Sequence, residues 1–105
     1  KIHIETSGAY PLSGSWDWIC LSPKKTKLPL SPIYKVANEL KIIIQNKHDF
    51  KFAEEQAAKV AEKCELFLQP EWSKRALMTP LIVDYVMQNP QWKISLQTHK
   101  YLNIP

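Results

Sequence analysis

Residues 39–45, with the sequence Glu-Leu-Lys-Ile-Ile-Ile-Gln, constrain the fold more than any other part of this chain. A short, nearly continuous apolar run between polar residues is typical of a strand that is buried on both faces of a parallel sheet. Residues 92–97 show the other strand pattern, because Trp92, Ile94 and Leu96 alternate with polar side chains. Similar short runs occur earlier and between these two segments. We therefore predict five strands, at residues 1–5, 16–21, 39–45, 65–69 and 92–97.

Helical patterns separate the later strands. Ser31 and Pro32 are typical of a helix start, which predicts a short helix to residue 37. Asp49 is a candidate cap for an amphipathic helix over residues 50–64, and Thr79 with Pro80 for a helix that ends before Asn89. Strand–helix–strand passages favour parallel, right-handed units. We predict a single α/β domain over residues 1–105, with about five mostly parallel strands and two main helices. Half of a partial (β/α) barrel is favoured over a small open sheet.

Composition excludes several classes of protein. The chain has 105 residues, 45% of them hydrophobic and 23% charged, so a folded domain is expected rather than a disordered segment. A formal charge of +4 is typical of a solvated surface, and we expect no nucleic-acid or membrane partner. Cys20 and Cys64 are too far apart to suggest a metal motif, and we expect buried free thiols in a cytoplasmic protein. Because Lys1 opens directly in a strand-like run, we expect the natural chain to begin upstream.

Polar residues follow each predicted strand. In parallel α/β folds the C-terminal strand ends form the ligand site, although many strands end in polar residues for structural reasons alone. The candidates, each with a structural alternative, are Glu5 with Thr6 and Ser7, Ser22-Pro23-Lys24, Gln45-Asn46, Gln69-Pro70-Glu71 with Trp72, and the run from Gln97 to Lys100 that includes His99. Glu39 and Lys41 lie one pleat apart, and we expect them to pair on one face of the sheet.

The last fifteen residues combine a strand with a polar run and three apolar anchors, Tyr101, Leu102 and Ile104. A terminal segment with such anchors is expected to dock on the domain instead of fraying. We therefore expect the carboxylate of Pro105 to be held inside the molecule.

Five of these segments resemble one known family. They are Ile4-Glu-Thr-Ser-Gly8, Asp17-Trp18 with Ser22-Pro-Lys24, Asn38-Glu-Leu-Lys41, Leu68-Gln-Pro70 and the run from Trp92 to Pro105 that contains Ser-Leu-Gln-Thr-His-Lys. Together they are similar to the C-terminal half of 7-carboxy-7-deazaguanine synthases, radical S-adenosylmethionine (SAM) enzymes of queuosine biosynthesis. The resemblance implies a homodimeric partial barrel that converts 6-carboxy-5,6,7,8-tetrahydropterin to 7-carboxy-7-deazaguanine with loss of ammonia. It also implies SAM, a [4Fe–4S] cluster, Mg²⁺ and a reductant protein such as flavodoxin.

The resemblance assigns roles to particular residues. It implies that SAM is bound by Ser22, Pro23, Lys24, Gln69, Pro70, Glu71 and Trp72, with Glu5 and Ser7 nearby. His99, Pro105 and Thr6 are the implied substrate contacts. The three closely spaced cysteines that hold the family's cluster, and the magnesium ligand after them, have no counterpart here. This segment alone is therefore expected to be inactive, with no catalytic or metal-binding residue of its own.

Two other functions remain open on the sequence alone. The first is a non-catalytic half-barrel that binds a nucleotide-like ligand or a partner chain through the same strand ends. The second is RNA binding through the lysines of residues 24–27 and exposed tryptophans.

Overall fold

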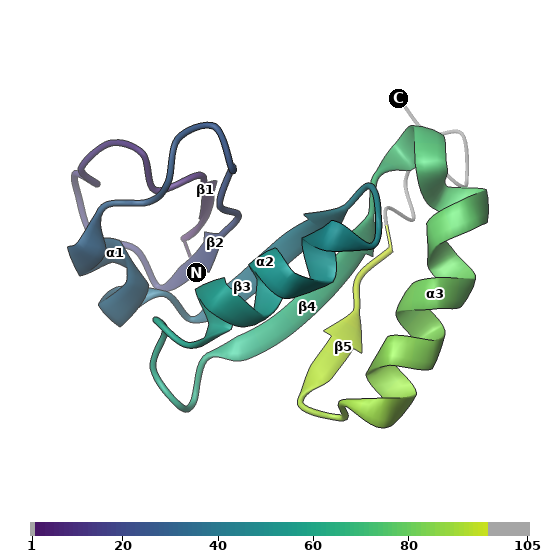
Figure 1. Ribbon diagram of the computed structural model, residues 1–105. Coiled ribbons are helices and arrows are strands. Elements are labelled where there is room, and N and C mark those ends of the chain that lie inside the picture. Colours follow the sequence, from purple (N-terminus) through teal and green to yellow (C-terminus); the bar gives the residue numbers. More distant parts are fainter. Residues whose placement is uncertain (1, 97–105) are drawn as a thin grey trace.

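The computed structural model describes residues 2–96, which form one parallel sheet with helices on one of its faces. The strands are β1 (His3–Thr6), β2 (Trp18–Leu21), β3 (Glu39–Ile44), β4 (Glu65–Pro70) and β5 (Trp92–Ile94). Their order in the sheet is their order in the chain, and every neighbouring pair is parallel. Figure 1 shows this progression from β1 to β5. The prediction of five parallel strands in an α/β fold is confirmed.

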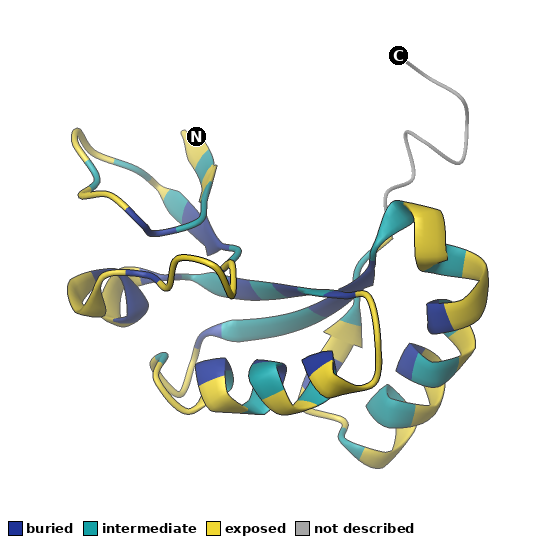
Figure 2. Ribbon diagram, turned by 45° about the horizontal axis from the view of Figure 1, so that its top comes forward, coloured by how far each residue is buried: buried dark blue, intermediate teal, exposed yellow. Residues whose placement is uncertain are grey.

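Three α-helices connect the strands. α1 (Ser31–Val36) follows β2, α2 (His48–Ala57) joins β3 to β4, and α3 (Arg75–Gln88) joins β4 to β5 after a short 3-10 turn, η1 (Trp72–Lys74). Helix α2 packs on β3, and α3 packs on β4 and β5. Figure 2 shows α2 and α3 on the same side of the sheet, which we call the outer face; the opposite side is the inner face.

The two faces of the sheet differ in burial because side chains alternate along each strand. On β3, Leu40, Ile42 and Ile44 point to the outer face and are at most 1% exposed, whereas Glu39, Lys41 and Ile43 on the inner face are only partly buried. Leu68, Ile82 and Trp92 complete the outer core. The predicted burial of this strand on both faces thus holds for one face, since no helix of the described chain covers the inner one.

Helix boundaries differ from the sequence-based predictions in three places. Helix α3 starts at Arg75 and contains Pro80, so Pro80 removes one backbone hydrogen bond inside the helix and does not start it. Helix α2 spans His48–Ala57 instead of residues 50–64, and turns lead from there into β4. Lys47 is its N-cap residue, so Asp49 lies in the first turn and the prediction that it caps the helix is wrong. Helix α1 has Leu30 at its N-cap, with Ser31 as its first residue and no side-chain cap.

The structure also tests the predictions about the two cysteines and about Glu39 and Lys41. Cys20 and Cys64 are buried free thiols, as expected. Glu39 and Lys41 share a face, but each bonds to another strand: the Trp18 indole donates to Glu39 at 2.6 Å, and Lys41 pairs with Glu5 at 2.8 Å. Between residues 2 and 96, no helix is long and apolar enough to cross a membrane.

Candidate functional site

The C-terminal ends of four strands meet at one edge of the sheet, as the parallel topology requires. In the register of the strands, Thr6 aligns with Leu21, and Ile44 aligns with Pro70. Backbone hydrogen bonds continue past the strands, because the Ser22 amide donates to Thr6 at 2.8 Å and the Glu71 amide donates to Ile44 at 3.0 Å. The polar residues that follow β1 to β4 are therefore held at one edge.

A cavity opens at this edge because β2 and β3 separate. They are aligned over only two residue pairs, which end at Leu21 and Leu40, whereas β3 and β4 are aligned over six. Beyond Leu40 the space between the two strand ends is a cavity of about 460 Å³. We call it the edge cavity; its lining residues are Ser22, Pro23, Lys24, Lys25, Thr26, Ile43, Gln45, Asn46, Asp49 and Phe52.

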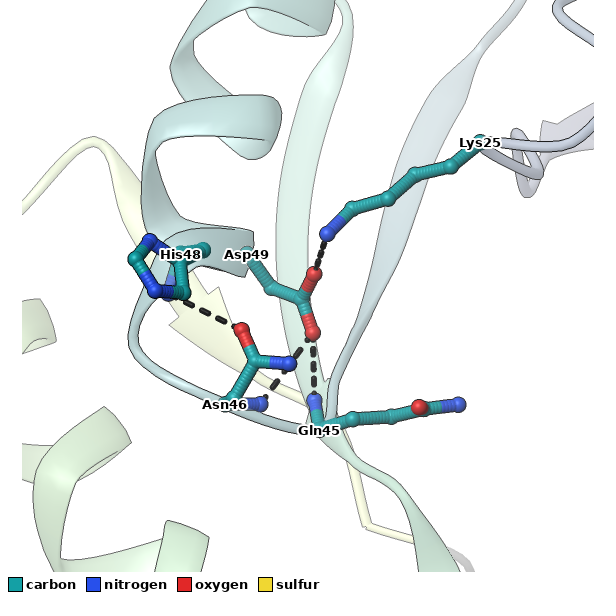
Figure 3. A network of polar contacts seen from close by, with 5 residues as sticks. All are labelled: Lys25, Gln45, Asn46, His48 and Asp49. Carbon is teal, nitrogen blue, oxygen red and sulfur yellow. Dashed lines mark hydrogen bonds and ion pairs between the residues drawn. The ribbon is translucent and has the colours of Figure 1, made fainter.

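Asp49 organises one wall of the edge cavity (Figure 3). It is only 4% exposed, and one carboxylate oxygen accepts from the Gln45 amide at 2.7 Å and the Asn46 amide at 3.2 Å. The other oxygen is paired with the ammonium of Lys25. Burial alone would raise the pKa of Asp49, but the Lys25 partner and the two backbone donors together lower it. Asp49 is therefore an ionised anchor of the turn from β3 into α2.

The turn after β1 brings Thr6 and Ser7 to the same edge. The Gly8 amide donates to the Thr6 hydroxyl at 3.0 Å, and the Leu30 amide donates to the Gly8 carbonyl at 2.7 Å. Gly8 has a φ of +74°, and a Cβ there would lie 2.7 Å from Leu21 and 2.8 Å from Pro29. Only glycine fits this position without rearrangement. Since the Thr6 hydroxyl accepts in this turn, its own proton remains available to donate.

Side-chain contacts hold the C-terminal end of β4 and the residues that follow it. Gln69 is buried and its side-chain carbonyl accepts from the Ser95 hydroxyl at 3.1 Å. The Ser73 hydroxyl donates to Glu71 and lowers the pKa of that carboxyl group. Arg75 stacks 3.8 Å from the centre of the Trp72 ring and donates to the Trp72 carbonyl at 2.7 Å. These contacts fix residues 69–75 in place at the end of β4. We call residues 69–72 the rim.

A second, smaller cavity of about 260 Å³ lies on the inner face of the sheet. It is polar, and its lining residues are His3, Ile4, Glu5, Trp18, Cys20, Glu39, Lys41 and Ser95. The two contacts described above, Glu5 with Lys41 and Trp18 with Glu39, tie β1 and β2 to β3 across this cavity.

Comparison with known proteins identifies relatives of this chain. No family model matches, but the chain is 70% identical over all 105 residues to the 7-carboxy-7-deazaguanine synthase of Flavobacterium psychrophilum. It is 52% identical over 104 residues to the enzyme of that name from Synechocystis. The chain is therefore similar over its whole length to the 7-carboxy-7-deazaguanine synthases. It spans about half the length of these relatives, 50% of each.

A solved structure agrees with this family. The crystal structure of QueE from Escherichia coli superimposes with a TM-score of 0.78 and 26% identity, over 90% of this chain and 44% of that one. The described residues therefore have the fold of part of that QueE structure.

The structure brings together some of the residues predicted for this synthase segment and separates others. Ser22, Pro23 and Lys24 line the edge cavity, but Gln69, Pro70, Glu71 and Trp72 form the neighbouring rim outside its lining. Glu5 lines the inner cavity, whereas Thr6, the last residue of β1, and Ser7 after it lie outside the lining of both cavities. His99 and Pro105 lie outside the described residues, as does the predicted docking of the chain end. The structure adds Lys25 and Asp49, whose pairing sequence reasoning missed because one resembled a solvated lysine and the other a helix cap.

The described residues do not fit a metal centre. Between residues 2 and 96, no three His, Cys, Asp or Glu side chains converge closely enough to hold a metal ion. Burial raises the pKa of Cys20 to about 12 and that of Cys64 to about 11, with nearby carboxylates adding to both shifts. Both thiols are therefore protonated at neutral pH in this environment. The part of the chain that the structure describes therefore offers no cluster of metal ligands.

Proposed function

We propose that this chain is the C-terminal half of a radical SAM 7-carboxy-7-deazaguanine synthase. The reaction would convert 6-carboxy-5,6,7,8-tetrahydropterin to 7-carboxy-7-deazaguanine with loss of ammonia, which makes the enzyme a carbon–nitrogen lyase. The observation that carries the proposal is the 70% identity to a synthase of that name over the whole chain. The polar strand ends at one edge of the sheet support it, because this edge is where parallel α/β enzymes bind their ligands.

The edge cavity has the chemistry to hold part of SAM. Pro23, Ile43 and Phe52 offer apolar walls for a ring, while Ser22 and the side-chain carboxamides of Gln45 and Asn46 offer polar partners. We assign the ammonium of Lys24 to the methionyl carboxylate, by charge complementarity. The rim formed by Gln69, Pro70, Glu71 and Trp72, together with Glu5 and Ser7, would complete the SAM site. When bound to a reduced cluster, SAM supplies the one-electron chemistry that removes a hydrogen from the substrate.

The pterin would be held next to SAM by donors and acceptors from this chain. Thr6 can donate its hydroxyl proton, and the inner cavity adds Glu5, Lys41 and Ser95. His99 and Pro105 are proposed as further contacts on the strength of sequence resemblance alone. A pterin carries many donors and acceptors, and a site that pairs all of them rejects analogues that lack one.

The cluster and Mg²⁺ require ligands from elsewhere, because the described residues of this chain do not supply them. We propose that an N-terminal half provides these ligands, that this segment alone is inactive, and that a reductant such as flavodoxin serves the whole enzyme. We also propose a homodimer in the cytoplasm. Two features support an assembly. β1 is an edge strand that pairs only with β2 within the described residues, and α3 exposes the apolar side chains of Leu77, Val83 and Met87. Buried free thiols suit a reducing compartment.

The test is a pair of assays on the full-length protein and on residues 1–105 alone. The full-length protein is reconstituted anaerobically with iron and sulfide, and then supplied with dithionite, SAM, Mg²⁺ and 6-carboxytetrahydropterin. Formation of 7-carboxy-7-deazaguanine, followed by mass spectrometry, is the expected result, with no product from the shorter chain. A full-length protein that binds SAM but leaves the pterin unchanged would overturn the proposed reaction and favour a non-catalytic binding protein.

A further inference from the structure

We propose that Lys25 and Asp49 are positioning residues for SAM, and that their ion pair holds the segment 22–24 in place over the edge cavity. This inference rests on the proposed function, because it concerns the same cavity. Neither residue needs to touch SAM. Their role is to fix the distance between the two walls of the cavity, one formed by the chain after β2 and the other by the turn from β3 into α2.

The wall after β2 needs such a support. Beyond Leu21 and Leu40 the two strands no longer pair, so the sheet does not hold the chain after β2 against β3. At its near end this segment is tied to β1, through the amide of Ser22. The following turn is closed on itself, with the Lys27 amide donating to the Lys24 carbonyl at 3.2 Å, and its four residues 24–27 are exposed.

Lys25 reaches across the cavity to α2 and makes two contacts there. Its ammonium pairs with Asp49, and it lies 5.6 Å from the centre of the Phe52 ring. Both contacts come from one side chain next to Lys24, the residue assigned to the carboxylate of SAM. Fixing Lys25 therefore limits where Lys24 and Ser22 can lie.

Asp49 links this contact to the opposite wall. The carboxylate that pairs with Lys25 also accepts the amides of Gln45 and Asn46, both of which line the cavity (Figure 3). One buried carboxylate thus fixes the turn that carries one wall and receives the lysine that carries the other. If Lys25 is removed, the turn keeps its two backbone bonds, and the segment 22–24 loses its link to α2.

The expected effect falls on binding more than on folding. The Lys25 side chain is 48% exposed and that of Asp49 is 6% exposed, so removing the lysine costs some stability, but the buried carboxylate keeps its two backbone donors. Ligand affinity, in contrast, depends strongly on whether the contacting groups are already in place. Loss of the link should therefore weaken SAM binding while the folded structure survives.

The experiment compares Lys25→Met with Lys27→Met in the full-length, cluster-loaded protein. Lys27 is a matched control in the same turn, since it is exposed and contacts Tyr10 instead of α2. Calorimetry with SAM should give about tenfold weaker binding for Lys25→Met, equivalent to about 1.4 kcal/mol, and an unchanged Kd for Lys27→Met. The pterin Kd should not change in either variant, and the urea midpoint should fall slightly for Lys25→Met and stay unchanged for Lys27→Met. Lys25→Arg, which keeps the charge, should restore most of the SAM affinity.

A second variant keeps the test independent of Lys25 alone. Asp49→Asn should weaken SAM binding at least as much, and the double variant with Lys25→Met should lose no more than the larger single loss. A SAM Kd for Lys25→Met equal to that of the unmodified protein would overturn the inference and leave the proposed function intact. Equal losses of SAM and pterin affinity would also overturn it, because they would indicate general loosening. An unmodified protein that does not bind SAM would overturn both.

Discussion

The two faces of the sheet are built for different purposes. The outer face is packed under α2 and α3, and its largest side chains, such as Trp92, Leu40 and Leu68, are at most 1% exposed. The inner face has no helix layer among residues 2–96, and carries the Glu5–Lys41 ion pair and the Trp18–Glu39 hydrogen bond. This difference indicates that stability comes mainly from the outer side of the sheet, and the proposed ligand contacts of Glu5 and Lys41 lie on the other side. Substitutions on opposite faces should therefore separate the two.

Replacing Trp92 should give the largest loss of stability. Trp92 is 1% exposed in the outer core, and its indole donates to Glu54 at 2.9 Å. Trp92→Ala leaves a cavity and removes one of the two donors to the Glu54 carboxylate, and should lower the free energy of unfolding by about 3–5 kcal/mol. The neighbouring residue Lys93 is the control, because its exposed pair with Glu65 makes Lys93→Met nearly neutral. Urea unfolding measures both, and similar losses in the two variants would refute the contrast between faces.

Replacing Gly8 tests whether the close packing of the outer face extends to the edge of the sheet where the strands end. An alanine Cβ there would meet Leu21 and Pro29 in a backbone conformation with φ +74°, whereas Gly14, with φ +84°, has nothing within 4 Å of the same position. Gly14→Ala should cost about 1 kcal/mol for the backbone alone, and Gly8→Ala should cost about 2–3 kcal/mol because a steric clash is added. Thermal unfolding of the two variants gives the difference. Equal losses in the two variants would mean that Leu21 and Pro29 move aside and relieve the steric clash at Gly8.

Much of the fold is predictable from local pattern. The apolar run of β3 and the alternation of β5 gave strands at the right places, and the strand–helix rhythm gave their parallel order. Boundaries that depend on tertiary packing were less accessible. Pro80 is typical of a helix start, yet α3 begins at Arg75, where the Trp72 carbonyl accepts from the Arg75 side chain. No sequence rule indicates that such a turn precedes the proline.

The candidate site was predictable in part. Polar residues after parallel strands predict a common edge, and Ser22, Pro23 and Lys24 do line a cavity there. The cavity itself depends on the separation of β2 from β3 after two residue pairs, which no periodicity encodes. The Lys25–Asp49 pair joins residues 24 positions apart. An interaction across that separation is visible only once the chain is folded.

Replacing Tyr85 on the outer side of the sheet should give an intermediate loss of stability, and this loss should depend on pH. Its hydroxyl donates to Glu54 and its ring stacks on Phe50 with centroids 4.5 Å apart, so it joins α3 to α2. Tyr85→Phe should lose about 1 kcal/mol at neutral pH, the usual value of one hydrogen bond. Burial, followed by the bond to Glu54 and its charge, raises the pKa of Tyr85 from 10.0 to about 12.

The sign of the pH effect follows from that shift. The folded state favours the protonated phenol, so this contribution is complete below pH 10 and is lost as the pH rises toward 12. The stability difference between the unmodified chain and Tyr85→Phe should therefore shrink over that range, as measured by urea unfolding at a series of pH values. A difference that stays constant up to pH 12 would show that the phenol does not titrate with folding.

Lys41 should show the smallest effect on stability, although its side chain is only 16% exposed. Its partner Glu5 is 56% exposed on the inner face, so water solvates the carboxylate whether or not the pair forms. Lys41→Met keeps the aliphatic stem and should change the free energy of unfolding by less than about 1 kcal/mol. The same substitution removes a positive charge from the inner cavity, and in the full-length protein it should weaken pterin binding in calorimetry. A large loss of stability in Lys41→Met would mean that the inner face also stabilises the fold. It would contradict the contrast between a structural outer face and a ligand-binding inner face.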